Sequence, residues 1–145
     1  SEEFFRRVSK HFPNRIDFAT FGRLWNDIFT ENCEMEPLIK RLKTHYPLYL
    51  ISNTNDLHFE YVRKRYGILG HFARFFPSHL VGHRKPDQAM FEHVLGEIKA
   101  KPEETLFVDD MAEFVASAKK LGIHGIRFQS RAQLESELRA LGVRF

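Results

Sequence analysis

Polar residues that could do phosphate chemistry occur at three places in the sequence, each close to a short apolar run. They are the pair Ser52-Asn53, the lysine Lys85, and the carboxylate pair Asp109-Asp110. If the apolar runs are parallel strands, their carboxyl ends meet at one edge of a sheet, where ligands bind. We therefore expect a hydroxyl, an amide, a lysine and two carboxylates to converge on one rim.

This set of side chains suits the binding and transfer of a phosphoryl group. A hydroxyl and nearby backbone N–H groups bind phosphate oxygens, and the Lys85 ammonium can neutralise charge on a transferring group. The paired carboxylates of Asp109 and Asp110 can hold a hard cation such as Mg²⁺. Taken singly, Ser and Asn are ordinary helix caps and Lys85 is a solvated lysine. The carboxylate pair is more informative, because adjacent carboxylates repel each other where one cap would suffice.

From residue 47 onward, short apolar runs alternate with amphipathic helical patterns. The predicted strands are 47–51, 74–76, 105–108 and 125–128. The predicted helices are 56–66, 86–99 with Pro86 at its start, one from Met111 that stops at Gly122, and one striped by Leu134, Leu138 and Leu141. Strand–helix alternation with continuous apolar strands predicts an α/β fold with a parallel sheet.

Before residue 47 the apolar spacing is helical throughout. Three stripes are present: Phe4, Phe5, Val8 and Phe12; Phe18, Phe21, Trp25 and Ile28; and Met35, Leu38, Ile39 and Leu42. Asn14 and Asp17 stand where turn and N-cap residues belong. We therefore divide the chain into a helical part, residues 1–46, and an α/β core, residues 47–145.

Composition excludes several classes of protein. The 145 residues are enough for one domain with a core, and 43% hydrophobic with 28% charged residues excludes a disordered or collagen-like chain. The longest apolar run, Leu48-Tyr49-Leu50-Ile51, is far too short to span a membrane, and no signal-peptide pattern opens the sequence. The single cysteine, Cys33, offers no disulfide within the chain. We expect a cytoplasmic protein with no membrane partner.

The charge balance is mildly basic, with a net charge of +3. The densest positive stretch, Arg63-Lys64-Arg65, is framed by Tyr61 and Tyr66, which superficially resembles a surface that stacks on bases. Because the other Lys and Arg residues are spread along the chain, the solvated face of a helix explains this stretch better. We expect an anionic small-molecule substrate and no nucleic-acid partner.

The polar residues lie within three longer segments that form a recognisable set. These are Leu50-Ile51-Ser52-Asn53-Thr54-Asn55, His83-Arg84-Lys85-Pro86-Asp87-Gln88-Ala89-Met90-Phe91, and Leu106-Phe107-Val108-Asp109-Asp110. They resemble motifs two, three and four of the haloacid dehalogenase-like hydrolase superfamily, and the resemblance runs from about Phe21 to Phe128. It implies a Rossmann-like core of parallel strands flanked by helices. The helical region before residue 47 is similar to the small helical cap of this superfamily.

The resemblance also implies a mechanism and a role for each polar residue. In this superfamily an Asp attacks phosphorus, and water then hydrolyses the aspartyl-phosphate. By position, Ser52 would bind the phosphoryl group with Asn53 supporting its loop, and Lys85 would stabilise the nucleophile and the phosphoryl charge. Asp110 would ligate Mg²⁺, with Asp109 as its neighbour or a second ligand. Dehalogenating members usually lack the acidic pair, so the implied activity is that of a phosphatase acting on a small phosphorylated metabolite.

The sequence departs from the superfamily's pattern at two points. Motif one, an apolar strand ending in Asp-x-Asp or Asp-x-Gly, is absent, and its nearest approach at Asp17 fits a helix cap. Relatives commonly place Asn or Asp where this chain has Phe114, which helix packing alone would explain. The start at Ser1 without Met then predicts a fragment whose parent protein holds the nucleophile in an upstream segment.

The first strand of this fold lies between the strands that carry motifs two and four. Without it, the runs 47–51 and 105–108 would each keep unpaired backbone groups on their facing edges. Direct pairing of the two runs would shift Ser52 relative to Asp110 and spoil the site. We therefore expect a strand-wide gap, filled by an upstream piece or by a strand donated from a second chain, as in a homodimer.

Two other functions use the same types of residue. A response-regulator receiver has an acidic pair, a Ser or Thr and a Lys at strand ends, but its acidic pair comes first in the chain and here it comes last. A catalytically inactive domain, kept for binding or regulation, fits the missing motif one and Phe114. The retention of Ser52, Lys85 and the acidic pair favours a hydrolase. We expect that activity in the complete parent protein and none from the 145 residues alone.

Overall fold

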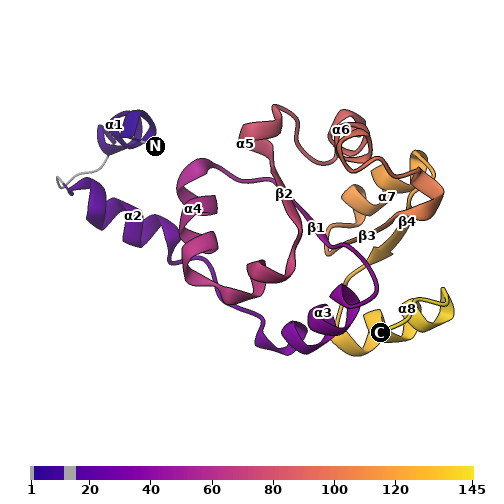
Figure 1. Ribbon diagram of the computed structural model, residues 1–145. Coiled ribbons are helices and arrows are strands. Elements are labelled where there is room, and N and C mark those ends of the chain that lie inside the picture. Colours follow the sequence, from indigo (N-terminus) through magenta and orange to yellow (C-terminus); the bar gives the residue numbers. More distant parts are fainter. Residues whose placement is uncertain (1, 12–15) are drawn as a thin grey trace.

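The computed structural model describes residues 2–11 and 16–145, arranged as shown in Figure 1. In chain order the elements are α1 (Glu2–Ser9), α2 (Phe18–Asn26), η1 (Cys33–Met35), α3 (Glu36–Lys43), β1 (Tyr49–Ser52), α4 (Asp56–Arg65), η2 (Gly67–His71), β2 (Arg74–Pro77), α5 (Ser78–Val81), α6 (Gln88–Ile98), η3 (Pro102–Glu104), β3 (Leu106–Asp109), α7 (Ala112–Lys120), β4 (His124–Arg127) and α8 (Arg131–Ala140). The predicted alternation of strands and helices after residue 47 is confirmed, and with it the α/β fold. None of the helices described is long and apolar enough to cross a membrane.

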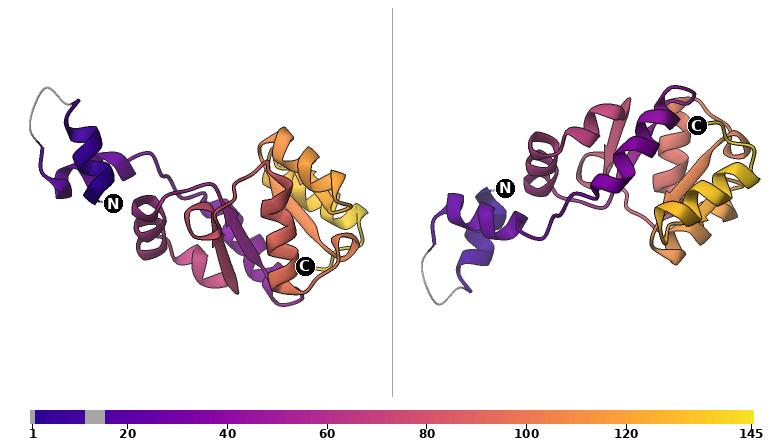
Figure 2. Two further views of the ribbon diagram at one scale, coloured as in Figure 1. Left: turned by 90° about the horizontal axis from the view of Figure 1, so that it is seen from above. Right: turned by 90° about the horizontal axis from the view of Figure 1, so that it is seen from below.

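α1 and α2 pack on each other through aromatic side chains and lie beyond α4, at the end of the molecule away from α8 (Figure 2). The rings of Phe4 and Phe5 lie 6.1 and 5.1 Å from the ring of Phe21, which is 2% exposed. Asp17 caps α2 as predicted, because its carboxylate accepts a hydrogen bond from Thr20 N at 2.7 Å.

Two predicted apolar stripes extend past the helices that carry them. Ile28 is 71% exposed and Leu141 is 50% exposed, because α2 and α8 have each ended before these residues. Pro86 was predicted to open α6, but the helix begins two residues later at Gln88, since Asp87 is the N-cap, with a ψ of 130° that is not helical. Two members of the predicted patterns, Phe12 and Asn14, lie outside the described residues.

The described strands form two separate parallel sheets of two strands each. β1 pairs with β2 in a register that places Ser52 opposite Pro77, and β3 pairs with β4 with Asp109 opposite Arg127. Among the described residues β1 and β3 therefore do not pair, and the prediction that they would not pair directly is confirmed.

Helices cover both faces of the β1–β2 sheet. On one face, Phe76 of β2 packs against Met90 and Val94 of α6 in a buried cluster. The neighbouring Phe75 points to the other face, as alternation along a strand requires. There its ring meets Phe59 of α4, with centroids 5.7 Å apart. The sheet is thus the middle layer of three.

The two sheets share the helical layer that α6 and α7 form. Phe91 of α6 meets the Phe107 ring of β3 edge-on, with centroids 5.1 Å apart. Ile51 of β1 packs against the same buried cluster, in which Phe91 lies with Ala118 and Ile123. A common layer of helices therefore fixes the two sheets relative to each other, although no strand joins them in the part of the chain described.

α3 and α8 cover the other face of the β3–β4 sheet (Figure 2). Leu38 of α3 is 0% exposed and packs with Ile126, Leu134 and Leu138. α3 therefore packs on the core, whereas α1 and α2 pack on each other and α2 also reaches α4. The division of the chain after residue 46 stays a prediction.

Candidate functional site

The loop after β1 is joined to the loop before α6 by the side-chain amide of Asn53. Its Nδ2 donates to the carbonyl oxygen of Lys85 at 2.7 Å, and its Oδ1 accepts from the backbone N–H of Lys85 at 2.8 Å. Both partners are backbone groups, so the amide fixes where the chain runs at Lys85 and not only its side chain. The expected role of Asn53 in supporting the loop of Ser52 stays a prediction.

The ammonium group of Lys85 lies at the carboxyl end of β3, in a buried position. Its Nζ donates to Asp109 Oδ2 at 2.5 Å, and the two side chains are 8% and 9% exposed. The same Nζ lies 5.5 Å from the centre of the Phe107 ring and 5.1 Å from that of Phe114. A lysine with three N–H donors and one hydrogen-bond acceptor among the described residues keeps donors for an incoming anion.

The two adjacent carboxylates have different surroundings. Both oxygens of Asp109 are engaged, because Oδ2 accepts from Lys85 and Oδ1 accepts from Met111 N at 2.9 Å. Asp110 is exposed, and its backbone oxygen accepts a hydrogen bond from Arg127 Nε at 3.1 Å. Asp109 therefore balances the buried lysine, while the carboxylate of Asp110 faces the solvent.

The donor set suits a hard cation, but only in part. Carboxylate oxygens are the ligands that Mg²⁺ prefers, and Asp110 with Asp109 would offer them. In the described ranges, however, no group of three or more His, Cys, Asp and Glu side chains is placed to hold a metal ion. The carboxylates of this chain therefore fit a Mg²⁺ site that needs further oxygen ligands from elsewhere.

Ser52 is the last residue of β1, and the segment after it is held in place from the β2 side. Ser78 Oγ both accepts from Thr54 N and donates to Thr54 O, each at 3.0 Å. Asn55 then caps α4 by accepting from His58 N at 2.9 Å. The Ser52 hydroxyl itself has no hydrogen-bond partner within the described residues, so it is available to a ligand at this rim.

The helix that this loop starts also carries the contact with α2. His58 of α4 stacks on Trp25 with ring centroids 5.6 Å apart and planes 8° apart, and its Nδ1 lies 2.9 Å from Asn26 Oδ1. Asn26 is 5% exposed and donates through Nδ2 to Gly22 O at 2.7 Å. Burial lowers the pKa of His58 below its ordinary 6.5. Through this histidine, α4 is joined to α2 of the helical part.

The structure brings four of the five predicted site residues into one connected group. Asn53, Lys85 and Asp109 form a chain of hydrogen bonds, and Asp110 follows Asp109 directly. Ser52 is adjacent to Asn53 but makes no contact of its own in this group. Helix packing was expected to explain Phe114 without any chemistry; its ring also lies near the ammonium of Lys85, with Nζ 5.1 Å from the ring centre. The only sign in the sequence that this position is unusual was that relatives commonly have Asn or Asp there.

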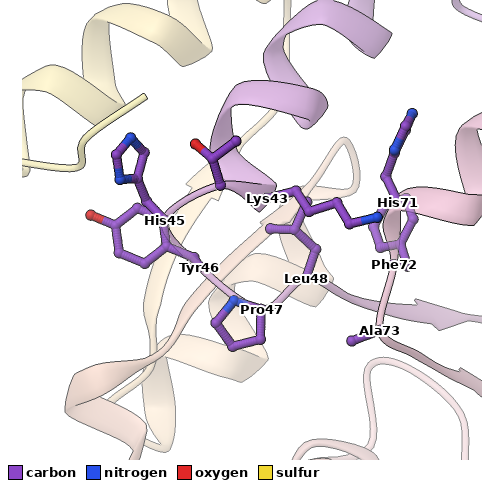
Figure 3. A pocket seen from close by; sticks show the side chains of 9 residues that line it. Lys43, His45, Tyr46, Pro47, Leu48, His71, Phe72 and Ala73 are labelled. Atoms are coloured by element: carbon purple, nitrogen blue, oxygen red, sulfur yellow. The ribbon is translucent and has the colours of Figure 1, made fainter.

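A pocket of about 380 Å³ lies at the opposite ends of β1 and β2, where the two strands begin (Figure 3). Its lining residues are Lys43, Thr44, His45, Tyr46, Pro47, Leu48, His71, Phe72 and Ala73. The Lys43 ammonium there donates to Gly70 O at 3.1 Å. None of the predicted site residues lines this pocket, so it is separate from the group at the carboxyl ends.

With this arrangement established, comparison with known proteins identifies the family. The model of the family described as haloacid dehalogenase-like hydrolase matches residues 23–122. The chain belongs to this family. The matched residues include all three motif segments, so the haloacid dehalogenase-like assignment from those segments is confirmed.

Curated relatives of this hydrolase-family chain include phosphatases. The chain is 33% identical over 124 residues to a sesquiterpene phosphatase of Aspergillus oryzae, covering 85% of the chain and 63% of that protein. It is 35% identical over 91 residues to a drimenol cyclase of Aspergillus calidoustus, covering 63% of the chain and 17% of that protein. The chain thus spans less than two thirds of the length of either relative.

Solved structures of haloacid dehalogenase-like proteins share the fold. A predicted HAD-like hydrolase from Porphyromonas gingivalis superposes with a TM-score of 0.81 at 26% identity, covering 97% of this chain and 73% of that one. A HAD family enzyme from Bacteroides thetaiotaomicron, solved with magnesium and inorganic phosphate, superposes with a TM-score of 0.82 at 24% identity. The match covers 92% of this chain and 72% of that one. The Rossmann-like character of the core is confirmed by these likenesses.

Proposed function

We propose that the parent protein of this chain is a Mg²⁺-dependent phosphatase that hydrolyses a small phosphorylated metabolite through an aspartyl-phosphate. The observation that carries the proposal is the buried Lys85 ammonium, held at the carboxyl end of β3 with donors left over for an anion. Burying a lysine with its counter-ion costs solvation free energy, and replacing the pair by apolar side chains would often be neutral or stabilising. A functional requirement for a fixed positive charge explains why the pair is present.

The chemistry needs a nucleophile, which we place on a strand outside the 145 residues. A strand between β1 and β3 would fill the separation of the two sheets and end beside Ser52 and Asp110. The edges of β1 and β3 that face each other would then be paired, as backbone groups in a covered sheet must be. Val108 of β3, which is 37% exposed, would be covered by the same strand.

In the first step the carboxylate of that Asp attacks the phosphorus and the P–O bond to the metabolite breaks. The oxygen of the metabolite leaves with the electron pair and takes up a proton from solvent water, which releases the alcohol. In the second step water attacks the phosphorus, the acyl–phosphate bond breaks, and inorganic phosphate leaves the regenerated carboxylate. Lys85 and the hydroxyl of Ser52 bind the phosphoryl oxygens in both steps.

Mg²⁺ would be held by Asp110, with Asp109 as its neighbour or a second ligand. When bound, the cation supplies positive charge that offsets the negative charge of the phosphoryl group. Asp109 also serves Lys85, because its Oδ2 accepts a hydrogen bond from the ammonium, while its Oδ1 accepts from Met111 N. The relatives that are named phosphatases, and the likeness to a structure solved with magnesium and phosphate, support this assignment.

Hydrolysis of a generic aryl phosphate by the parent protein tests the proposal. We expect Mg²⁺-dependent turnover, and Lys85→Ala should reduce it by roughly a hundredfold or more, since electrostatic stabilisation of this kind is worth several kcal/mol. Lys120→Ala, at an exposed lysine on α7, is the matched control and should leave turnover unchanged. The 145 residues alone should show none.

An inactive binding or regulatory module is the competing function, and the same assay separates the two. A parent protein that binds inorganic phosphate without any turnover would favour the module. Turnover by the 145-residue chain alone would show that the nucleophile lies within it, against our placement of that residue upstream.

A further inference from the structure

The Lys85 ammonium lies between groups of two different kinds. The carboxylate of Asp109 accepts a hydrogen bond from it at 2.5 Å. The rings of Phe107 and Phe114 approach it with centroids at 5.5 and 5.1 Å, within the range of a cation–π interaction. Two aromatic rings therefore lie beside one ammonium whose side chain is 8% exposed.

The two rings come from different elements and differ in how they are held. Phe107 lies in β3, two residues before Asp109, so both side chains point to the same face of the sheet. Its ring packs edge-on against Phe91 in the core, with centroids 5.1 Å apart. Phe114 lies in the first turn of α7 and is only partly buried. Phe107 therefore contacts both Lys85 and the core ring of Phe91, whereas the ring contact described for Phe114 is the one with Lys85.

A ring at position 114 has a different effect on Lys85 from that of a polar side chain. An amide or carboxylate oxygen would accept one of the N–H donors of the ammonium and compete with an incoming phosphoryl group. The face of a ring attracts the same charge through its quadrupole but offers no lone pair. An anionic oxygen is a stronger partner than a ring, so it can take the N–H donors without displacing a hydrogen bond.

We infer that Phe114 is a positioning residue for Lys85: its ring holds the buried ammonium in place while leaving N–H donors free for a phosphoryl group. The phosphoryl part of this inference rests on the proposed function, whereas the placement of Lys85 by Phe114 does not. Two tests therefore follow, one on each part.

The first test measures the placement of Lys85 in the 145-residue chain by NMR. Protons above the face of an aromatic ring are shifted upfield, so the ε-methylene protons of Lys85 should stand upfield of those of exposed lysines. The chain is labelled at lysine, and Lys85→Met assigns the signal. Phe114→Leu should move it downfield, and Phe114→Tyr, which keeps the ring, should not.

Phe145→Leu is the matched control for this test. The Phe145 ring also faces cations, with Arg41 and Arg139 at 5.3 and 5.0 Å from its centre, but it packs in the cluster around Leu38. Its removal should leave the Lys85 signal unchanged. A Lys85 signal that is the same in the native chain and in Phe114→Leu would overturn the inference.

The second test replaces Phe114 in the parent protein by phenylalanines with one, two and three ring fluorines. Fluorination weakens the quadrupole of the ring while the size of the side chain changes little. We expect the KM for the aryl phosphate, and the Kd for inorganic phosphate, to rise stepwise to a total of roughly threefold to tenfold. A role in packing alone does not depend on the quadrupole of the ring, so it would leave both constants unchanged across the series.

The outcomes distinguish this inference from the proposed function. If the Lys85 signal is shifted but the parent protein shows no turnover, the proposed phosphatase activity is refuted and the positioning role of Phe114 remains. The fluorine series is then measured by phosphate binding alone. Normal turnover whose KM does not respond to fluorination would refute the role of Phe114 in phosphate binding. If Phe114→Leu does not fold, the fluorine series carries the test through the Kd for inorganic phosphate, because the fluorinated rings keep the shape of phenylalanine.

Discussion

Asn53 and Lys85 are joined by two hydrogen bonds that run in opposite directions between one side-chain amide and one residue's backbone. The pair connects the end of β1 to the loop before α6, across 32 positions of sequence. At the other end of the same lysine, the ammonium is held by Asp109 of β3. Lys85 is therefore attached to both sheets, by its backbone to one and by its charge to the other.

We predict that Asn53→Ala lowers the free energy of unfolding by about 1–3 kcal/mol, because two partly buried backbone groups of Lys85 lose their partners. Asn53→Asp keeps an acceptor for Lys85 N–H but places a carboxylate oxygen against the carbonyl oxygen of Lys85, so it should destabilise the chain as well. Chemical denaturation of the 145-residue chain measures both. Asn32→Ala is the control, since that exposed side chain makes no capping hydrogen bond. Equal stabilities for Asn53→Ala and the native chain would contradict the prediction.

The two adjacent carboxylates should respond differently to substitution. In the parent protein, Asp110→Asn should abolish the rise in melting temperature that millimolar Mg²⁺ produces, with little effect when Mg²⁺ is absent. Asp109→Asn should lower the melting temperature without Mg²⁺, because it leaves the Lys85 charge buried without its counter-ion. Glu113→Gln, at an exposed residue in the first turn of α7, is the control. An unchanged response to Mg²⁺ in Asp110→Asn would remove Asp110 from the metal site.

The free energy of unfolding should decrease as the pH is lowered, because His58 lies at the contact between α2 and α4. The pKa of His58 is lowered in the folded chain by burial, so over the interval below its ordinary 6.5 the unfolded chain binds more protons. The free energy of unfolding that His58 contributes is therefore complete above that value and declines as the pH falls toward the folded pKa. Between about pH 7.5 and about pH 5, the melting temperature of His58→Gln should fall less than that of the native chain. His45→Gln, at an exposed histidine, is the control, and its melting temperature should fall as much as that of the native chain.

Gly125 of β4 should not tolerate a side chain. An alanine Cβ there would lie 2.8 Å from Val115 Cγ1 and 3.0 Å from Lys119 Cε, and Val115 is 5% exposed. Gly125→Ala should therefore destabilise the chain by about 1–3 kcal/mol through overpacking of α7 on the sheet. Gly96→Ala in α6, where a Cβ meets nothing within 4 Å, should instead stabilise it by about 0.5–1 kcal/mol. Denaturation midpoints of the two variants should move in opposite directions.

The fold could be predicted from the sequence where local pattern decides the structure. The apolar run that ends at Ser52 and the one that ends at Asp109 are both strands, and Asp17 caps its helix, because each depends on neighbours within a few residues. The ends of helices were less predictable. Ile28 continues the apolar spacing of α2 but lies outside it, since spacing alone does not say where the backbone leaves the helix.

From the sequence it could be predicted that these polar residues lie near one another, but not how their side chains contact one another. That Asn53 and Lys85 lie close together follows from strand ends meeting at one rim. That the amide binds the backbone of the lysine, and that Asp109 uses both oxygens within the chain, depends on how three separate loops pack. The position of Phe114 next to Lys85 depends on the angle at which α7 leaves β3, which no local pattern encodes.

The helix α6 presents adjacent residues to different sheets: Met90 packs with Phe76 of β2, and Phe91 packs with Phe107 of β3. Opening of either sheet would therefore remove the packing partners of one side of α6. Amide hydrogen exchange should find β2, β3 and α6 protected to similar free energies, as one cooperative unit. The N-terminal helices, which meet the rest chiefly through His58 and Trp25, should open separately and earlier.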